Sequence, residues 1–186
     1  LISEFVYSAE IYDTKTNTIF TVNKDWFEFG YDYSKLFTKK YFLLNTTFKL
    51  KKCNDLESSF AKGRSYEIIR HRKQRYPYKG TCGSFFRNFK DEEVFLELNG
   101  KKIIFSGYYL DQVGVKGALR FGNAGVSSKH ANMIENFGGA KSEDIINVAK
   151  EMQKRVFDKY GILLMTECEL LGFEKYPLYN SLLQLK

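Results

Sequence analysis

The stretch from residue 142 to residue 161 constrains the fold more than any other part of the sequence. Ser142 is a good N-cap, and acidic residues follow it in the first turn of the expected helix. Gly161 is a stop signal at the other end. Between them, apolar side chains recur at helical spacing: Ile145, Ala149, Met152, Val156 and Tyr160. The pattern predicts a helix over residues 142–160, and we interpret its apolar stripe as core rather than as a site.

Strand signals fill the first quarter of the chain. Residues 4–12 alternate apolar and polar side chains, residues 14–17 have turn chemistry, and residues 18–22 are extended again, which is typical of a hairpin. Residues 41–51 (YFLLNTTFKLK) are rich in aromatic and β-branched side chains and predict another strand.

Shorter elements are expected further on. Asn99 and Gly100 join two apolar runs, residues 94–98 and 101–105, and Asn-Gly is the strongest short hairpin signal. The other expected segments are a short helix at 107–113 closed by Gly114, a bent strand at 117–126, an extended stretch at 129–134 and a strand at 162–173 with Glu167 and Glu169 on one face. This mixture of elements predicts an α+β protein.

Residues 55–74 predict a second helix, with Asp55 as its N-cap and Pro77 as its stop. Its expected apolar face consists of Leu56, Phe60, Ile68 and Ile69. The end of this helix is strongly basic, from Arg70 to Arg75. Because cations complement the dipole at a helix C-terminus, the basic cluster is either a solvated helix end or a contact for an anionic partner.

Composition limits the classes of function. The chain has 186 residues, 44% of them apolar, so it can bury the core of one domain, or of one domain and part of another. No stretch approaches the roughly 20 apolar residues of a membrane span, and no signal peptide is recognised. The net charge of +7 permits nucleic acid, a membrane surface or a phosphorylated small molecule as partner, or reflects only a lysine-rich surface. The chain begins without Met inside an apparent strand, so we expect a further segment upstream.

Three cysteines, Cys53, Cys82 and Cys168, are scattered along the chain. Their number is odd and no C-x-x-C pair occurs, so we predict no metal site. Scattered thiols suit a reducing cytoplasm better than a disulfide framework.

The segment at residues 79–89 (KGTCGSFFRNF) holds the most suggestive chemistry. Ser84 has a hydroxyl that can deliver a proton at short range, and Phe85 and Phe86 are expected to hide it from water. Asn88 offers a donor and an acceptor nearby. On spacing alone, a serine between Gly and Phe is more often a turn residue, so both interpretations stand at this point.

A series of short motifs carries a resemblance to a known family. They are FGYDYS at 29–34, RKQ at 72–74, GTCGSFFRN at 80–88, GYYLDQVGVKG at 107–117, VSSKHAN at 126–132, AKSEDI at 140–145 and TECELLG at 166–172. In this order and at these distances they resemble the UDP-N-acetylenolpyruvoylglucosamine reductase family. The resemblance covers most of residues 1–173.

The resemblance implies an enzyme of peptidoglycan precursor synthesis. It implies that NADPH and FAD reduce the C=C bond of UDP-N-acetylglucosamine enolpyruvate to give UDP-N-acetylmuramate. Ser84 matches the family serine that protonates a carbon, and Glu167 matches the glutamate that stabilises the enol intermediate. To donate a hydrogen bond, Glu167 would have to be protonated, which requires a raised pKa. Without the resemblance, Glu167 is better explained as a strand-face carboxylate in water.

The resemblance also implies contacts to the substrate. The positions that match are Tyr31, Lys73, Asn88, Lys116 and His130. Taken singly, each lysine is better explained as a surface residue, because lysine is mostly exposed in any protein.

Two departures from the family pattern stand out. Asp32 occupies the position of a family arginine that holds the substrate carboxylate, and Arg87 or Arg120 is a candidate replacement. The family's flavin pyrophosphate loops lie upstream of the region that matches residue 1, so we assign no cofactor-binding residue. Two alternatives remain: a relative that binds a UDP-sugar without turnover, and a basic module for single-stranded nucleic acid.

The expected organisation follows from these motifs. Residues 1–52 are the distal part of a flavin domain, 53–78 a connecting helix, 79–173 the substrate domain and 174–186 a tail. We expect a cytoplasmic monomer without a nucleic-acid or membrane partner.

Overall fold

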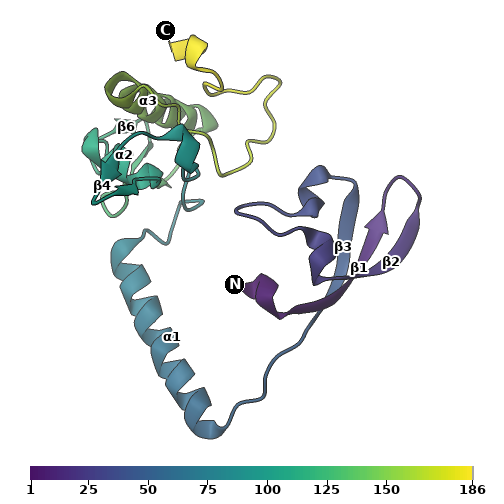
Figure 1. Cartoon of the computed structure of the whole chain (residues 1–186). Coiled ribbons are helices and arrows are strands. Elements are labelled where there is room, and N and C mark those ends of the chain that lie inside the picture. The colour runs from purple at the N-terminus through teal and green to yellow at the C-terminus, as the bar shows by residue number, and fades with distance from the viewer. Residues whose placement is uncertain (186) are drawn as a thin grey trace. The chain divides into compact units, whose positions relative to one another are not determined.

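The computed structural model describes residues 1–185 and confirms the α+β class (Figure 1). The chain divides into two compact units, Leu1–Lys62 and Gly63–Lys186. The division falls inside the long helix α1 (Asp55–Arg75).

The first unit is built on a three-stranded antiparallel sheet. Its strands are β1 (Val6–Asp13), β2 (Thr18–Asn23) and β3 (Tyr41–Phe48), in the order β2-β1-β3. The predicted hairpin and the predicted strand at 41–51 are both confirmed. The Asp13 carboxylate accepts a hydrogen bond from the Lys15 backbone N–H at 2.7 Å, which fixes the turn between β1 and β2.

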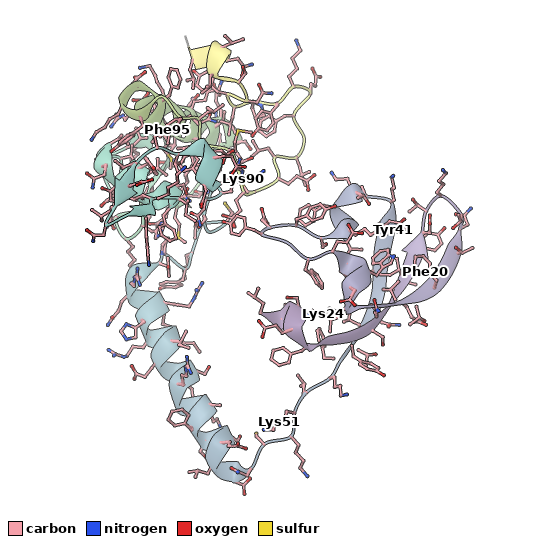
Figure 2. The ribbon with its side chains drawn as sticks, viewed as in Figure 1. Phe20, Lys24, Tyr41, Lys51, Lys90 and Phe95 are labelled. Carbon is pink, nitrogen blue, oxygen red and sulfur yellow. The ribbon has the colours of Figure 1, made fainter. Side chains whose placement is uncertain are left out.

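The core of the first unit is small. It consists of Ala9, Ile11, Val22 and Phe27, with a cluster of aromatic rings at its edge. Three 3-10 helices flank the sheet: Ile2–Phe5, Lys24–Phe27 and Lys35–Thr38. The Trp26 ring lies 5.9 Å from that of Phe20 and 5.0 Å from that of Tyr41, both edge-on; Figure 2 labels Phe20 and Tyr41.

Helix α1 differs from its prediction in two ways. Asn54, not Asp55, caps it: the Asn54 side chain accepts from the Glu57 backbone N–H at 2.9 Å, and the Glu57 carboxylate accepts from the Asn54 N–H at 3.0 Å. The expected apolar face is wrong, because Leu56 and Phe60 are 80% and 75% exposed and no residue of α1 is buried. The apolar stripe of α1 is interrupted between Phe60 and Ile68 by Lys62, Gly63 and Arg64. The helix ends before Pro77, as predicted.

The second unit surrounds one long helix. Helix α3 (Ser142–Tyr160) contacts all three strands of the antiparallel sheet β6 (Arg120–Phe121), β7 (Ala124–Val126) and β8 (Ile134–Asn136), as well as helix α2 (Ser106–Gln112). The hairpin of β4 (Glu97–Leu98) and β5 (Lys101–Lys102) and a 3-10 helix at Asp91–Glu93 complete the unit. The predicted helix at 142–160 is confirmed, and its apolar stripe is core.

Several details of the second unit correct the predictions. Lys141, not Ser142, is the N-cap of α3, and the Asp144 carboxylate accepts from the Lys141 N–H at 3.0 Å. The stretch at 129–134 was predicted to be extended, but residues before Met133 are not. The Ser127 hydroxyl accepts a hydrogen bond from the Lys129 N–H at 3.0 Å, and such a side-chain bond offers the backbone an alternative to strand pairing.

The strand predicted at 162–173 is also wrong. It shrinks to a single bridge between Thr166 and Phe86. The segment that would pair with this strand is residues 84–86. Ser84 pairs with Met133 and Phe86 pairs with Thr166, so residues 84–86 change partners within three positions and form no continuous ladder with either one.

The segment after residue 173 is anchored by one buried amide. Gln153 in α3 is fully buried and donates to the carbonyl oxygens of Leu164 and Tyr179, each at 2.8 Å. Its own oxygen accepts from the Tyr179 N–H at 3.1 Å. Leu178 is buried in the core beside this contact. A 3-10 helix at Leu182–Leu185 ends the described chain.

We predict that Gln153→Leu lowers the free energy of unfolding by about 3 kcal/mol, because it leaves buried carbonyl groups without donors. Urea unfolding measures this change. Lys154→Ala, on the exposed side of the same helix, is the matched control and should cost under about 1 kcal/mol. Equal losses in the two variants would contradict the anchoring role of Gln153.

Candidate functional site

Ser84 sits on a backbone that its flanking residues fix firmly. Phe85 and Phe86 are 2% and 0% exposed and belong to the core of the second unit. Ser84 itself is half-buried. Gly80 is needed before it, because its φ is +63° and a Cβ there would lie 2.4 Å from the Asn136 carbonyl oxygen. The two rings therefore anchor residues 84–86, the Ser84 segment, in the core.

The buried side chain of Asn132 holds this segment. Its oxygen accepts from the Phe86 N–H at 3.0 Å, and its amide donates to the Phe86 carbonyl at 2.7 Å. The Asn132 backbone carbonyl accepts from the Phe85 N–H at 2.9 Å. One residue thus satisfies three backbone groups directly after Ser84, in a place where no strand does so.

The same asparagine links the backbone after Ser84 to Asn88. Its amide donates to the Ser106 hydroxyl at 2.9 Å, and the hydroxyl also contacts the Phe86 carbonyl at 3.3 Å. The Ser106 backbone N–H donates to the Asn88 side-chain oxygen at 3.3 Å. Ser106 and Asn132 are 0% and 3% exposed, so the network lies inside the protein.

His130 joins the network from the other side. Its Nδ1 accepts from the Asn132 backbone N–H at 3.1 Å, so the neutral ring carries its proton on Nε2. Burial, with the nearby charges of Lys116 and Arg75, lowers the pKa of His130. The ring lies 5.3 Å from that of Tyr76, and a Cβ at Gly107 would approach it to 3.2 Å. His130 is therefore held in one position as a neutral donor.

A polar cavity of about 420 Å³ opens beside His130. It is lined by Gln74, Arg75, Gly107, Tyr108, Asp111, Lys116, Lys129, His130 and Ala131. Three of these side chains carry a positive charge and one a negative charge, and Lys116 lies 3.9 Å from Asp111. The cavity is suited to an anionic group.

Lys73 lies next to this cavity rather than in it. It lines a smaller cavity of about 230 Å³ with Arg72 and Tyr76. The Lys129 ammonium donates to the Lys73 carbonyl at 2.9 Å and so holds the C-terminal end of α1. The sequence motifs pointed to Lys73 and Lys116, whereas Arg75 and Lys129 gave no separate signal beyond the basic run and the KHAN motif.

Two other candidate residues lie elsewhere on the chain. Glu167 is exposed, and its backbone N–H donates to the Phe85 carbonyl at 2.9 Å, so the backbone at Glu167 lies beside the Ser84 segment. Tyr31 belongs to the first unit and is 65% exposed. Asp32, which follows it, has a φ of +47°. The structure thus brings Ser84, Asn88, His130, Lys116 and the Glu167 backbone into one unit.

Within residues 1–185, no group of three or more His, Cys, Asp or Glu side chains is arranged to hold a metal ion. None of the described helices has the length and apolar composition needed to cross a bilayer.

Comparison with known proteins identifies the family. The family model described as UDP-N-acetylenolpyruvoylglucosamine reductase, C-terminal domain, matches residues 74–171. The chain belongs to the UDP-N-acetylenolpyruvoylglucosamine reductase family. The resemblance seen in the short motifs is thereby confirmed.

Relatives with this name align along most of the chain. The reductase of Caldicellulosiruptor saccharolyticus is 33% identical over 173 residues, which are 92% of this chain and 51% of the relative. That of Prochlorococcus marinus is 37% identical over 153 residues, 78% of this chain and 45% of the relative. The crystal structure of the Thermus caldophilus reductase gives a TM-score of 0.66 at 26% identity, covering 90% of this chain and 53% of that one. The chain therefore spans about half the length of the relatives it matches.

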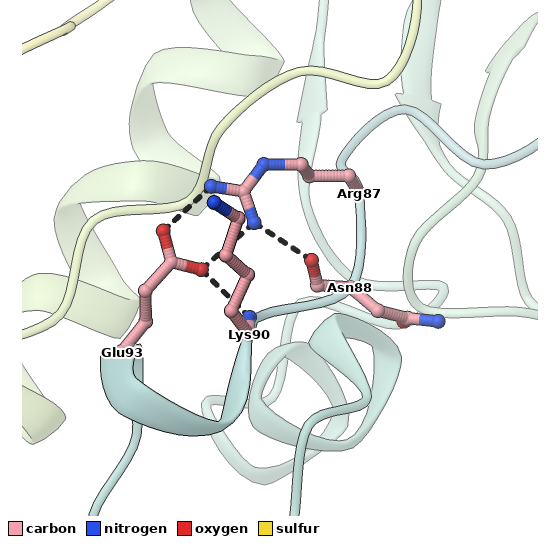
Figure 3. A network of polar contacts seen from close by, with 4 residues as sticks. All are labelled: Arg87, Asn88, Lys90 and Glu93. Carbon is pink, nitrogen blue, oxygen red and sulfur yellow. Dashed lines mark hydrogen bonds and ion pairs between the residues drawn. The ribbon is translucent and has the colours of Figure 1, made fainter. Parts of the chain in front are cut away.

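In this family member, Arg87 has a partner of its own. Its guanidinium donates to both carboxylate oxygens of Glu93, at 2.6 and 2.8 Å, and to the Asn88 carbonyl at 2.9 Å (Figure 3). The Lys90 N–H donates to the same carboxylate at 2.7 Å. The hydrogen bonds from Arg87 are the main cause that lowers the pKa of Glu93 to about 2. Arg87 thus serves to shape the turn after Asn88, which argues against it as the replacement for the family arginine at Asp32.

Arg120, the other candidate replacement, is placed differently. Its guanidinium lies 4.6 Å from the centre of the Phe137 ring, and it donates to the Gly122 carbonyl at 3.2 Å. These contacts hold it at the edge of the β6-β7 hairpin.

We predict that Glu93→Gln destabilises the second unit by about 1–2 kcal/mol at pH 7, because it removes a bidentate, partly exposed ion pair. The folded pKa of Glu93 lies below its ordinary value near 4.5, so the stabilisation is complete above that value and is lost as the pH falls towards 2. Unfolding measured from pH 7 to pH 2 should show this loss in the wild type and not in Glu93→Gln. The neighbouring Glu92→Gln is the control, and identical curves for the two variants would refute the role of Glu93.

Proposed function

We propose that the chain carries the substrate-binding and proton-donating part of a UDP-N-acetylenolpyruvoylglucosamine reductase. The reaction is reduction of UDP-N-acetylglucosamine enolpyruvate to UDP-N-acetylmuramate for peptidoglycan, in the cytoplasm. The observation that carries the proposal is the hydrogen-bond network of Asn132. It holds the backbone directly after Ser84, reaches Asn88 through Ser106, and contacts His130 at the wall of a basic cavity. Family membership supports this choice of substrate.

The basic cavity is proposed to bind the diphosphate of the substrate. Lys116, Arg75 and Lys129 supply positive charge, and the neutral His130 ring supplies an N–H donor. A phosphate oxygen about 4 Å from one cation gains on the order of 4 kcal/mol at an effective dielectric of 20, before desolvation is subtracted. Lys73, Asn88 and Tyr31 are proposed as further contacts to the substrate.

Ser84 is proposed as the proton donor. Addition of hydride to the enolpyruvyl group places negative charge on the enolate, which raises the basicity of the carbon to be protonated. A hydroxyl held within hydrogen-bond reach of that carbon can then deliver its proton although it is a weak acid in water. Asn132 makes three hydrogen bonds to the backbone of Phe85 and Phe86, so the backbone next to Ser84 is fixed in advance. Glu167 is proposed to stabilise the enol as a protonated carboxyl group.

FAD and NADPH are proposed as cofactors at the level of the family, and they would supply the hydride. The cavities around the proposed site are lined by residues from Ile69 onward, and we propose no contact between these residues and either cofactor.

We propose the domain organisation that the motifs indicate. Residues 1–52 are the distal part of a flavin domain, 53–78 the connecting helix, 79–173 the substrate domain and 174–186 the tail of a monomer. A relative that binds the UDP-sugar without turnover is the second candidate, because Asp32 stands in place of a cation and Arg87 is engaged by Glu93.

Calorimetry with UDP-N-acetylglucosamine enolpyruvate tests the proposal. We expect saturable binding that Lys116→Gln weakens about tenfold, the loss of roughly 1.4 kcal/mol. Lys175→Gln, in the segment after the core, and Ser84→Ala should bind like the wild type. Single-stranded DNA serves as the rival ligand, and binding of DNA with a steep salt dependence, without binding of the sugar nucleotide, would overturn the proposal.

A further inference from the structure

Tyr76 lies at the point where helix α1 ends. Its backbone N–H donates to the Arg72 carbonyl at 2.9 Å, which closes the last turn, and Pro77 follows directly. Every residue of α1 is exposed, whereas Tyr76 is half-buried. The tyrosine side chain is therefore partly covered where the helix side chains are not.

The ring of His130 is one neighbour of the Tyr76 ring. The two ring centres lie 5.3 Å apart and the ring planes are tilted by 34°, a spacing at which aromatic rings attract each other. The preceding residue, Lys129, donates from its ammonium group to the Lys73 carbonyl at 2.9 Å. Residues 129 and 130 thus hold the end of α1 at two points.

Two guanidinium groups approach the same tyrosine ring. That of Arg72 lies 5.1 Å and that of Arg75 5.9 Å from the centre of the Tyr76 ring, within the range of cation–π attraction. Arg75 also lines the basic cavity. The tyrosine ring cannot swing away from His130 without disturbing these contacts as well.

One hydrogen bond does not set the plane of the His130 ring. Its Nδ1 accepts from the Asn132 N–H at 3.1 Å, which fixes one atom of the ring. A Cβ at Gly107 would lie 3.2 Å from the His130 Cε1, so the ring already packs closely against the backbone there. A third contact is needed to set the plane, and Tyr76 supplies it.

We propose that Tyr76 is a positioning residue that holds the His130 ring in the wall of the basic cavity, so that its Nε2–H is available to an anion bound there. Tyr76 itself touches no part of the substrate in this role. A donor that is oriented beforehand binds an anion more tightly, because less freedom of rotation is lost on binding. The inference deepens the proposed function and rests on it for the identity of the anion, the substrate diphosphate.

The same contact helps to keep water away from His130. Burial is the largest cause that lowers the pKa of His130, the charges of Lys116 and Arg75 lower it further, and that of Asp111 opposes them. Removal of the Tyr76 ring exposes the imidazole, so the pKa of His130 should rise towards its ordinary value of 6.5. The charged and titratable groups around the imidazole are those of Arg75, Tyr76, Tyr108, Asp111, Lys116 and Lys129.

Proton NMR titration of the free chain tests the contact without any ligand. The chain has two histidines, and the other, His71, is exposed in α1 and serves as the internal reference. We expect Tyr76→Ala to raise the pKa of His130, and Tyr76→Phe, which keeps the ring, to titrate like the wild type. Tyr66→Ala removes an exposed ring of α1 and should leave His130 unchanged. An unchanged His130 titration in Tyr76→Ala would overturn the proposal.

Calorimetry with the sugar nucleotide measures the consequence for binding. We expect Tyr76→Ala to weaken binding about fivefold, the effect of one hydrogen bond that is no longer held in place, and Tyr76→Phe to bind like the wild type. His130→Ala should weaken binding by a similar factor. Addition of Tyr76→Ala to His130→Ala should then cause no further loss, because the tyrosine acts through the histidine. Losses that multiply in the double variant would overturn the proposal.

Inorganic pyrophosphate, which has the anionic group without uridine or sugar, separates this inference from the proposed function. If the wild type binds pyrophosphate and not the sugar nucleotide, the proposed function is wrong, and the same variants measured with pyrophosphate decide the role of Tyr76. Equal binding of pyrophosphate by the wild type and Tyr76→Ala would overturn that role. Tyr76 does not belong to the hydrophobic core of the second unit, so all variants should match the wild type by circular dichroism.

Discussion

The bonds between Asn132 and the backbone of Phe86 are the interaction on which the candidate site depends. Residues 84–86 carry two large rings into the core, so their backbone polar groups are buried, yet they belong to no continuous strand. A buried amide group without a partner costs about 1–3 kcal/mol. Asn132 supplies both a donor and an acceptor to Phe86, and its backbone carbonyl supplies an acceptor to Phe85. The position of Ser84 follows from these contacts.

The same side chain explains why the site residues occur together. Ser106 connects Asn132 to Asn88, and the Asn132 backbone N–H connects it to His130. The rigid platform under this network is the sheet β6-β7-β8 packed against α3. The candidate site residues are thus held by a polar network inside the protein. Loss of one partner from such a network costs more than a single hydrogen bond, because the other members are weakened as well.

The sequence predicted the regular parts of the fold well. Local signals sufficed for α3, with its apolar stripe and Gly161, and for the hairpin of β1 and β2, with its turn residues. Local signals failed where tertiary contacts decide the structure. Residues 162–173 would need a partner strand, which residues 84–87 do not provide. The apolar residues of α1 are not buried in a core. Of the site, the motifs indicated Ser84, Asn88, Lys116 and His130. The role of Asn132 could not be predicted, because nothing in the local sequence indicates that its side chain reaches residue 86.

Amide hydrogen exchange at Phe86 tests the central claim, that Asn132 fixes the Ser84 segment. In Asn132→Ala, we expect exchange at Phe85 and Phe86 to become at least about tenfold faster while the amides of α3 keep their protection. Asn136→Ala, which removes only an exposed cap on Gly138 and Ala140, is the control and should leave Phe86 unchanged. Ser106→Ala, a milder change in the same network, should give an intermediate rate. Unchanged protection of Phe86 in Asn132→Ala, with α3 intact, would show that Asn132 does not fix residues 84–86.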